Sequence, residues 1–391
     1  MKKSLTIYDD TEQLARKYKS QLEDLKAVDS QFDVMYIENE RLQRELSILN
    51  DRRSESRDGA RAHRENSIFD ETDVLLVDID LVQSNNPFLT GDRIAYLVRC
   101  FSKCGIIVGL SKFRKVDFDL TLREQPSSFV DLGIKSDQVA NPGLWANSWS
   151  GFRPWVWPVI PQMLNSFRKN EDLVRRNMSA PVVSSIGLES VASSLPSSAL
   201  DFLGSDALHA TFQEFVTQSE YGFRDGDKPL DQNAAARVAA ARISKCLETL
   251  VLPGQEVLVD APHLVSRYPS LLSGDPGRKT SWNKTAKFLS RTQLGLNHRK
   301  IERFRLKTET WVSRPVWLWP ELSNNQEIDE VDKPWKSREN QFVFCEDASA
   351  FFRLSECKEF TASVESYYVH RYIKKFSVFR YAPAVTLLQA G

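Results

Sequence analysis

A short apolar run that ends in carboxylates constrains this chain more than any other feature. The run Asp73-Val-Leu-Leu-Val-Asp78 is followed at once by Ile79-Asp80-Leu81. A strand that is apolar on both faces is typical of the interior of a parallel sheet, where helices cover both sides. Polar groups that follow such strands gather at the carboxyl edge of the sheet, where α/β proteins place ligand and catalytic groups. The run therefore predicts a buried strand that delivers Asp78 to that edge.

Other segments repeat this alternation of strand and helix. We expect further strands at 32–37, 105–111 and 128–135, with helical patterns at 41–50 and 91–101. Strands that alternate with helices predict an α/β fold, with a parallel sheet and flanking helices. The second half has an Ala-rich helical stretch at 234–250 and aromatic, strand-like sequence near its end. We expect a separate α+β domain there.

The length of the chain predicts more than one domain, because 391 residues exceed what a single core usually serves. Ser- and Ala-rich sequence around Pro196-Ser-Ser is typical of a linker. The expected division is an N-terminal helix within 1–30, an α/β domain with an aromatic extension over 31–177, a linker over 178–205, and an α+β domain of unknown role over 206–391.

Composition excludes several classes of partner. Lys and Arg total 52, and Asp and Glu also total 52. A neutral chain lacks the bulk attraction that draws basic proteins to nucleic acids and anionic membranes, so we expect neither as a partner. No apolar run reaches the roughly 18 residues of a membrane-spanning helix. The five cysteines form no Cys-x-x-Cys pair, which favours a reducing, cytoplasmic location over a disulfide framework or a zinc site.

An acid, a hydroxyl and an ammonium are expected at one sheet edge. Asp78, Ser111 and Lys135 each end a predicted strand. An ionised carboxylate can attack phosphorus when a divalent cation offsets the charge repulsion, and the other two groups can then bind phosphoryl oxygens. The structural alternatives stay open. Asp78 and Asp80 can cap the following turn, Ser111 can be an ordinary strand end, and Lys135 a solvated surface residue.

Acids near Asp78 predict a Mg²⁺ site. Mg²⁺ prefers oxygen ligands, usually one or two carboxylates together with water. Glu38 and Glu40 follow the strand 32–37 and would lie beside Asp78 if the two strands were neighbours. We therefore predict Mg²⁺ bound by Glu38, Glu40 and Asp78. A single helix over 35–52, with these acids in water, is the alternative.

The order and spacing of these residues resemble the receiver domain of two-component response regulators, over about residues 32–140. By position, Glu38-Asn39 corresponds to the acidic pair of the family, Asp78 to its phosphoacceptor, Ser111 to its hydroxyl residue and Lys135 to its lysine. The resemblance implies a flavodoxin-like fold, Mg²⁺ as cofactor and a histidine kinase as partner. The chain departs from the family at Asn39, where an acid is usual, and lacks the usual prolines after the phosphoacceptor strand and after the lysine.

The resemblance implies a two-component signalling protein that accepts a phosphoryl group from a histidine kinase on Asp78. It would serve as a regulator, an adaptor or a phosphate sink, with another protein of the same pathway as a further partner. Anti-phage operons contain receiver-bearing proteins of this outline, so we expect phage defence as the setting. Such a protein is a phosphoacceptor that switches contacts between domains, rather than a turnover enzyme.

Two alternatives remain. Asp78-Ile-Asp80 is similar to the first motif of haloacid-dehalogenase-like phosphatases, which implies Asp78 as nucleophile, Asp80 as general acid/base and Ser111 as second motif. That family needs a further acidic pair for magnesium, and the candidates are Asp117 with Asp119 and Asp131 with Asp137. The other alternative is a non-catalytic scaffold with an inactive receiver-like domain, whose tryptophan-rich segments such as 144–158 bind a partner.

Overall fold

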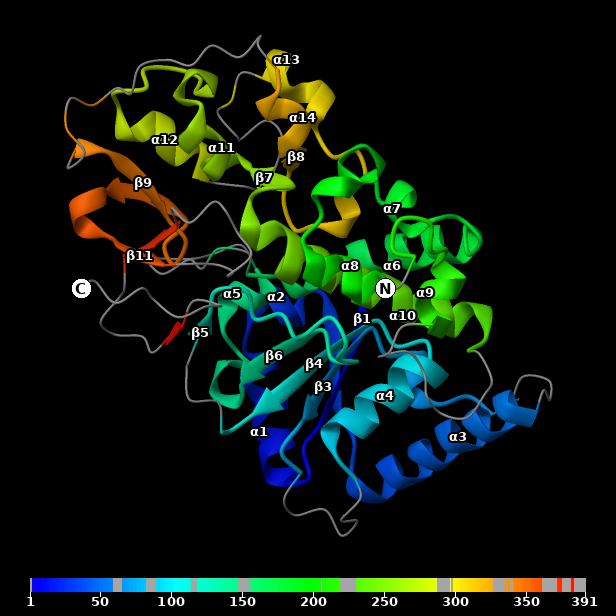
Figure 1. Cartoon of the computed structure of the whole chain (residues 1–391). Coiled ribbons are helices and arrows are strands. Elements are labelled where there is room, and N and C mark those ends of the chain that lie inside the picture. The colour runs from blue at the N-terminus through cyan, green and yellow to red at the C-terminus, as the bar shows by residue number, and fades with distance from the viewer. Residues whose placement is uncertain are drawn as a thin grey trace.

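The computed structural model of the chain contains a helix-flanked parallel sheet and a second, smaller sheet region (Figure 1). It describes residues 2–58, 65–81, 89–113, 118–146, 155, 157–204, 206–218, 230–286, 296, 298–325, 335, 337, 340–360, 371–374 and 381–382. For 56–58, 118–119, 218, 298 and 381–382 the backbone alone is described.

The first sheet has five strands, and every neighbouring pair is parallel. Its order is β2-β1-β3-β4-β6, which is the 2-1-3-4-5 order of flavodoxin-like sheets. This confirms the predicted α/β class. The strands are β1 (Lys3–Tyr8), β2 (Phe32–Tyr36), β3 (Val74–Asp78), β4 (Ile106–Ser111) and β6 (Leu132–Lys135).

Helices cover both faces of this sheet, because successive strand side chains point to opposite sides. On one face, Leu76 and Val108 pack into a core with buried residues of α1 (Glu12–Glu23), α2 (Lys26–Asp29), α5 (Pro142–Trp145) and α6 (Ile160–Arg176). On the other, Leu75 and Val77 share a core with α3 (Asn39–Asp58) and α4 (Gly91–Phe101). Figure 1 shows α3 and α4 side by side along the sheet.

Strand β1 is not among the strands that we expect from the sequence, and it lies between β2 and β3. Only Leu5 and Ile7 give its middle an apolar character, since Ser4 and Thr6 alternate with them. The hydroxyl groups of Thr6 and Thr72 lie 2.9 Å apart and hydrogen-bond to each other, so the buried polar side chain is satisfied. Residues 1–30 therefore contribute a strand as well as helices to the parallel-sheet unit.

The alternative of one helix over 35–52 is wrong, because β2 ends at Tyr36 and α3 begins at Asn39. Residues 178–205, expected as a linker, contain α7 (Val182–Ser185), a 3₁₀ segment at Glu189–Ser194 and α8 (Ser197–Leu203). Their apolar side chains, such as Val182 and Phe202, are buried in the same core as α3 and α4. Small polar residues separate these apolar ones along the chain, which explains the linker-like composition.

The second half begins with helices α9 (Phe212–Gln218) and α10 (Gln232–Cys246), and both helices and strands follow them. A four-stranded sheet has the order β10-β9-β12-β11 and is mainly antiparallel. Its strands are β9 (Phe342–Cys345), β10 (Ala350–Arg353), β11 (Lys358–Phe360) and β12 (Arg371–Ile373). This separate sheet region agrees with the predicted α+β architecture of the second half.

The remaining elements complete the C-terminal half. Helices there are α11 (Ala261–Arg267), α12 (Lys279–Ala286), α13 (His298–Ile301) and α14 (Trp319–Ser323). Two short strand pairs join β7 (Leu258–Asp260) with β8 (Val316–Leu318), and β5 (Phe118–Asp119) with β13 (Tyr381–Ala382). The second pair brings a strand from near the C-terminus beside the first half of the chain. Among the described residues, no helix is long and apolar enough to cross a membrane.

A buried charged network connects Trp155 to the C-terminal region. The indole Nε1 of Trp155 donates to Asp260 Oδ2 at 2.7 Å, and Arg314 Nη1 lies 3.2 Å from the same oxygen. His263 stands between Asp260 and Glu346, with Nδ1 and Nε2 at 2.5 and 3.1 Å from their carboxylates. Burial disfavours the imidazolium, but the two carboxylates outweigh it and raise the pKa of His263. Trp155 thus anchors the chain after the parallel sheet onto the second half.

A buried ion pair fixes β6 against α4. The side chains of Arg99 and Asp131 are hydrogen-bonded to each other and almost fully buried. Arg99 also donates to the Gly105 carbonyl at 2.7 Å, and Asp131 accepts from the Ile107 amide at 2.8 Å. These bonds tie the segment before β6 to the start of β4. A buried pair of this kind is strongly destabilising when only one partner is removed.

The substitution Asp131→Asn tests this pair. Because it leaves the Arg99 guanidinium buried without a counter-charge, we expect the free energy of unfolding to fall by about 3–5 kcal/mol. Urea unfolding at neutral pH measures the change. The control is Glu12→Gln, which breaks the exposed Arg16–Glu12 pair and should leave the urea midpoint unchanged. A loss below about 1 kcal/mol in Asp131→Asn would contradict the assigned role.

Candidate functional site

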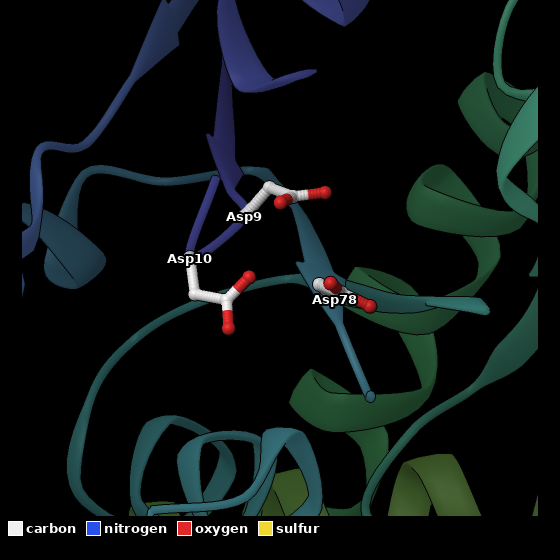
Figure 2. A group of neighbouring side chains, drawn as sticks. All are labelled: Asp9, Asp10 and Asp78. Atoms are coloured by element: carbon white, nitrogen blue, oxygen red, sulfur yellow. The ribbon is translucent and has the colours of Figure 1, made fainter. Parts of the chain in front are cut away.

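Three carboxylates meet at the carboxyl ends of β1 and β3. The register pairs Tyr8 with Val77, so the residues that follow, Asp9 and Asp78, come side by side at the sheet edge. One carboxylate oxygen from each of Asp9, Asp10 and Asp78 lies within 4.8 Å of the others. Figure 2 shows the three side chains grouped at these strand ends. All three residues are buried, with exposed fractions of 2%, 6% and 0% respectively.

Close backbone packing holds Asp78 in place. An added Cβ at Gly91, the first residue of α4, would lie 2.4 Å from the Asp78 carbonyl oxygen. Only glycine permits this approach of α4 to the end of β3. Gly109 of β4 similarly leaves room for the Ile79 side chain, which a Cβ would meet at 2.8 Å. The Asp80 amide then donates to Asp78 Oδ1 at 3.1 Å, which orients the carboxylate.

The turn after β1 orients Asp9. The Thr11 amide donates to Asp9 Oδ1 at 2.9 Å, just before α1 begins. The other oxygen, Asp9 Oδ2, is buried and accepts no hydrogen bond from the described residues. A buried carboxylate oxygen without a donor is costly, so this atom is suited to a cation.

Lys112 supplies positive charge to the same cluster. Its Nζ lies 3.5 Å from Asp78 Oδ2 and 3.7 Å from Asp9 Oδ2. Alternation explains its direction, because Val108 and Leu110 of β4 point into the core beneath Asp78, and Lys112 continues that series. Lys112 is not among the site residues predicted from the sequence. The alternation along the predicted strand 105–111, continued by one residue, would have placed its side chain on the same face as Asp78.

Burial and mutual repulsion disturb the titration of these groups. Burial, with the charge of Asp78 as a smaller cause, raises the pKa of Asp9 from 3.8 to about 6, although the Thr11 amide and Lys112 oppose it. Burial also raises the pKa of Asp78, and Asp10 adds to the effect. Partial burial disfavours the Lys112 ammonium, but Asp9 and Asp78 outweigh it and raise the pKa of Lys112. Three carboxylates thus face a single ammonium in this cluster.

Ser111 and Lys135 reach the same sheet edge but contact other acids. They are paired in the register of β4 and β6. The Ser111 hydroxyl donates to Asp80 Oδ2 at 2.5 Å, and Lys135 Nζ lies 3.2 Å from Asp137 Oδ2. The side chains of Ser111 and Lys135 lie on the face of the sheet opposite to that of Asp78. Lys112, rather than Lys135, is thus the lysine that forms an ion pair with Asp78.

Glu38 and Glu40 do not join the cluster. Both are exposed, Glu38 in the turn after β2 and Glu40 in the first turn of α3. Because β1 separates β2 from β3, the strand that precedes these acids is not a neighbour of the strand that carries Asp78. The expectation that the strand before Glu38 and the strand of Asp78 are neighbours is therefore wrong. In the described residues, the acids within ligand distance of Asp78 are Asp9 and Asp10.

Asn39 has a structural partner. Its side-chain oxygen accepts a hydrogen bond from the Tyr8 hydroxyl at 3.1 Å, and its amide lies 3.4 Å from the Asp10 carbonyl. This residue therefore supports the turn that presents Asp9 and Asp10.

The acid pairs considered for a phosphatase do not form a second cluster within the described part of the chain. Asp131 is engaged with Arg99, and Asp137 with Lys135. Asp117 lies outside the described residues, and only the backbone of Asp119 is described. The acids that meet Asp78 come instead from the start of the chain.

The donor set fits a small divalent cation. Three carboxylates offer hard oxygen ligands, as Mg²⁺ prefers, and their surplus negative charge favours a cation. Asp9 Oδ2 adds a buried acceptor that no donor among the described residues satisfies. The cluster is therefore suited to bind a divalent ion through Asp9, Asp10 and Asp78.

Comparison with family models, with curated proteins and with solved structures gives no match for this chain.

The pKa of Asp9 predicts a pH dependence of stability in EDTA. The folded protein holds this proton more tightly than the unfolded chain, so stability falls as pH rises from about 4 to about 6. A difference of about two pKa units corresponds to roughly 3 kcal/mol. Asp9→Asn should remove this part of the slope. Urea unfolding of both proteins across the pH range measures it, and parallel curves would contradict the assignment.

Proposed function

We propose that this chain is a receiver-like phosphoacceptor, in which Asp78 takes a phosphoryl group from a phosphohistidine of a histidine kinase with Mg²⁺ bound beside it. The observation that carries the proposal is the placement of Asp9 and Asp10 next to Asp78. An acidic pair after the first strand, beside an aspartate that ends the third, is the arrangement that the receiver resemblance implies. The 2-1-3-4-5 sheet order supports the same conclusion.

The proposed reaction is a single displacement at phosphorus. A carboxylate oxygen of Asp78 attacks the phosphorus and forms an O–P bond while the N–P bond of the phosphohistidine breaks. The imidazole nitrogen keeps the electron pair and takes a proton. Asp9 and Asp10 would hold Mg²⁺ beside Asp78, where the ion would offset the negative charge between carboxylate and phosphoryl oxygens. The Asp80 amide orients the Asp78 carboxylate through its hydrogen bond to Oδ1.

Lys112 and Ser111 are the side chains that we propose to bind the transferred group. Lys112 is already within 3.5 Å of Asp78, so its ammonium can pair with a phosphoryl oxygen after a small movement. The Ser111 hydroxyl ends the neighbouring strand and donates to Asp80, from which it would turn toward the phosphoryl group. Lys112 thereby takes the role that the resemblance assigned to Lys135.

The setting follows from the same proposal. The expected partners are a histidine kinase and a further protein of its pathway, with phage defence as the context. All five cysteines are free thiols, which supports a cytoplasmic location. The second half, joined to the sheet unit through the buried Trp155 network, is the proposed recipient of the phosphorylation signal.

Phosphorylation by acetyl phosphate with Mg²⁺ tests the proposal. We expect a mass increase of about 80 Da that hydroxylamine removes, because an acyl phosphate reacts with this nucleophile. Asp78→Asn should abolish the adduct, and EDTA should suppress it. Asp80→Asn is the matched control, two residues along the same turn, and should keep the adduct. A wild-type chain that acquires no adduct would favour the scaffold alternative.

The lysine assignment has its own test. Lys112→Met should slow adduct formation roughly 10-fold, equivalent to about 1.4 kcal/mol, because the ammonium near Asp78 is lost. Lys135→Met, at the end of the adjacent strand, should change the rate less than about 3-fold. Time courses of intact mass with acetyl phosphate measure both. The reverse order of effects would return the role to Lys135.

A phosphatase of the haloacid-dehalogenase type is the second candidate, because the Asp80 carboxylate lies two residues from Asp78 and is held by Ser111. In that case Asp80 would protonate the leaving group and later activate water. Hydrolysis of p-nitrophenyl phosphate with Mg²⁺ distinguishes the two functions. Turnover that is lost in both Asp78→Asn and Asp80→Asn would establish the phosphatase and exclude the simple phosphoacceptor.

A further inference from the structure

Two cysteines of the C-terminal sheet lie in unusually close contact. Cys345 ends β9, and Cys357 immediately precedes β11, 12 residues further along the chain. Their Sγ atoms are 2.9 Å apart. This separation is shorter than an ordinary van der Waals contact between two sulfur atoms and about 1 Å longer than a disulfide bond. Both residues are free thiols in the structure.

The sheet brings the two cysteines together. Strand β12 pairs with β9 at Tyr372 and Cys345, and with β11 at Ile373 and Lys358. Cys357, one residue before Lys358, therefore comes near β9 across the end of β12. Both side chains belong to one small apolar cluster with Val343, Ala348 and Tyr372. The contact is thus set by strand pairing rather than by a mobile loop.

Cys357 is half-buried, whereas the other four cysteines, Cys345 among them, are buried. Cys100, Cys104 and Cys246 are buried, and burial raises the pKa of each thiol to about 12. Such thiols react slowly, because the thiolate is the nucleophile. Cys357 is half-buried and donates to the Arg353 carbonyl at 3.2 Å. An oxidant can therefore reach Cys357, whereas Cys345 is buried in the core beside it.

We propose that Cys345 and Cys357 form a reversible dithiol–disulfide pair that reacts with hydroperoxides. The Cys357 thiolate attacks one oxygen of the peroxide, and the O–O bond breaks. Cys357 becomes a sulfenic acid, and hydroxide or alkoxide is released. The Cys345 sulfur then attacks the sulfenic sulfur, forming the S–S bond, while the Cys345 proton and the hydroxyl group leave as water. Two electrons pass from the two thiols to the peroxide. A small thiol reverses the reaction by disulfide exchange.

The disulfide would have a defined structural consequence. It would fasten the end of β9 to the start of β11, closing the connection that contains β10. Glu346, the next residue after Cys345, is hydrogen-bonded to both His263 and Arg371 in the buried network that includes Trp155. The redox state of the pair would therefore act on the part of the molecule that joins the two halves. In reducing compartments, disulfides of this kind are usually transient or redox-sensing.

Treatment of the full chain with hydrogen peroxide tests the proposal. We expect the intact mass to fall by about 2 Da and a linked peptide that contains Cys345 and Cys357, both reversed by dithiothreitol. In Cys345→Ser, the sulfenic acid of Cys357 has no partner and should be captured by dimedone. In Cys357→Ser, no disulfide should form and Cys345 should gain no dimedone. Cys246→Ser is the matched control and should behave as the wild type.

Several outcomes would overturn the pair. These are an unchanged mass at peroxide concentrations that oxidise a small thiol, a linked peptide that involves other cysteines, and dimedone capture at Cys357 in the wild type equal to that in Cys345→Ser. Asp78→Asn should oxidise like the wild type, because the pair does not depend on the acidic cluster. A failure of the proposed phosphorylation therefore leaves this result interpretable.

Discussion

The parallel pairing of β1 with β3 is the constraint on which the site depends. Once Tyr8 stands opposite Val77, the following residues of the two strands must meet at the sheet edge. Those residues are carboxylates, and they meet where little water reaches them. The fold therefore concentrates like charges that repel each other and lose hydration, which is unfavourable without a compensating cation.

Lys112 and close backbone packing make this arrangement tolerable. The ammonium approaches both Asp9 and Asp78, but one positive charge does not balance three acids. Gly91 lets α4 pack directly on the backbone of Asp78, and Gly109 of β4 leaves room for the next side chain, Ile79, so the end of β3 is tightly packed. A site that is rigid and short of positive charge is prepared for an added cation, whose binding relieves the repulsion already present.

The second half is joined to this sheet through burial rather than through a flexible tether. Trp155 donates to Asp260, and its ring lies 4.8 Å from the Arg314 guanidinium carbon and 4.4 Å from that of Arg371. Helix α10 packs against both α6 and α4, so it contacts helices from each face of the parallel sheet.

The sequence by itself determined the class of the fold and one member of the site. The apolar runs before Asp78 and Ser111 are typical of buried parallel strands, so the α/β class and the position of Asp78 at a strand end could be predicted. Strand β1 could not, because Ser4 and Thr6 interrupt its apolar pattern, and the burial of Thr6 depends on the partner hydroxyl of Thr72. Only the tertiary structure decided which strands are neighbours. Strand order, which sequence periodicity does not encode, selected Asp9, Asp10 and Lys112 to surround Asp78 and placed Glu38 and Glu40 in solvent.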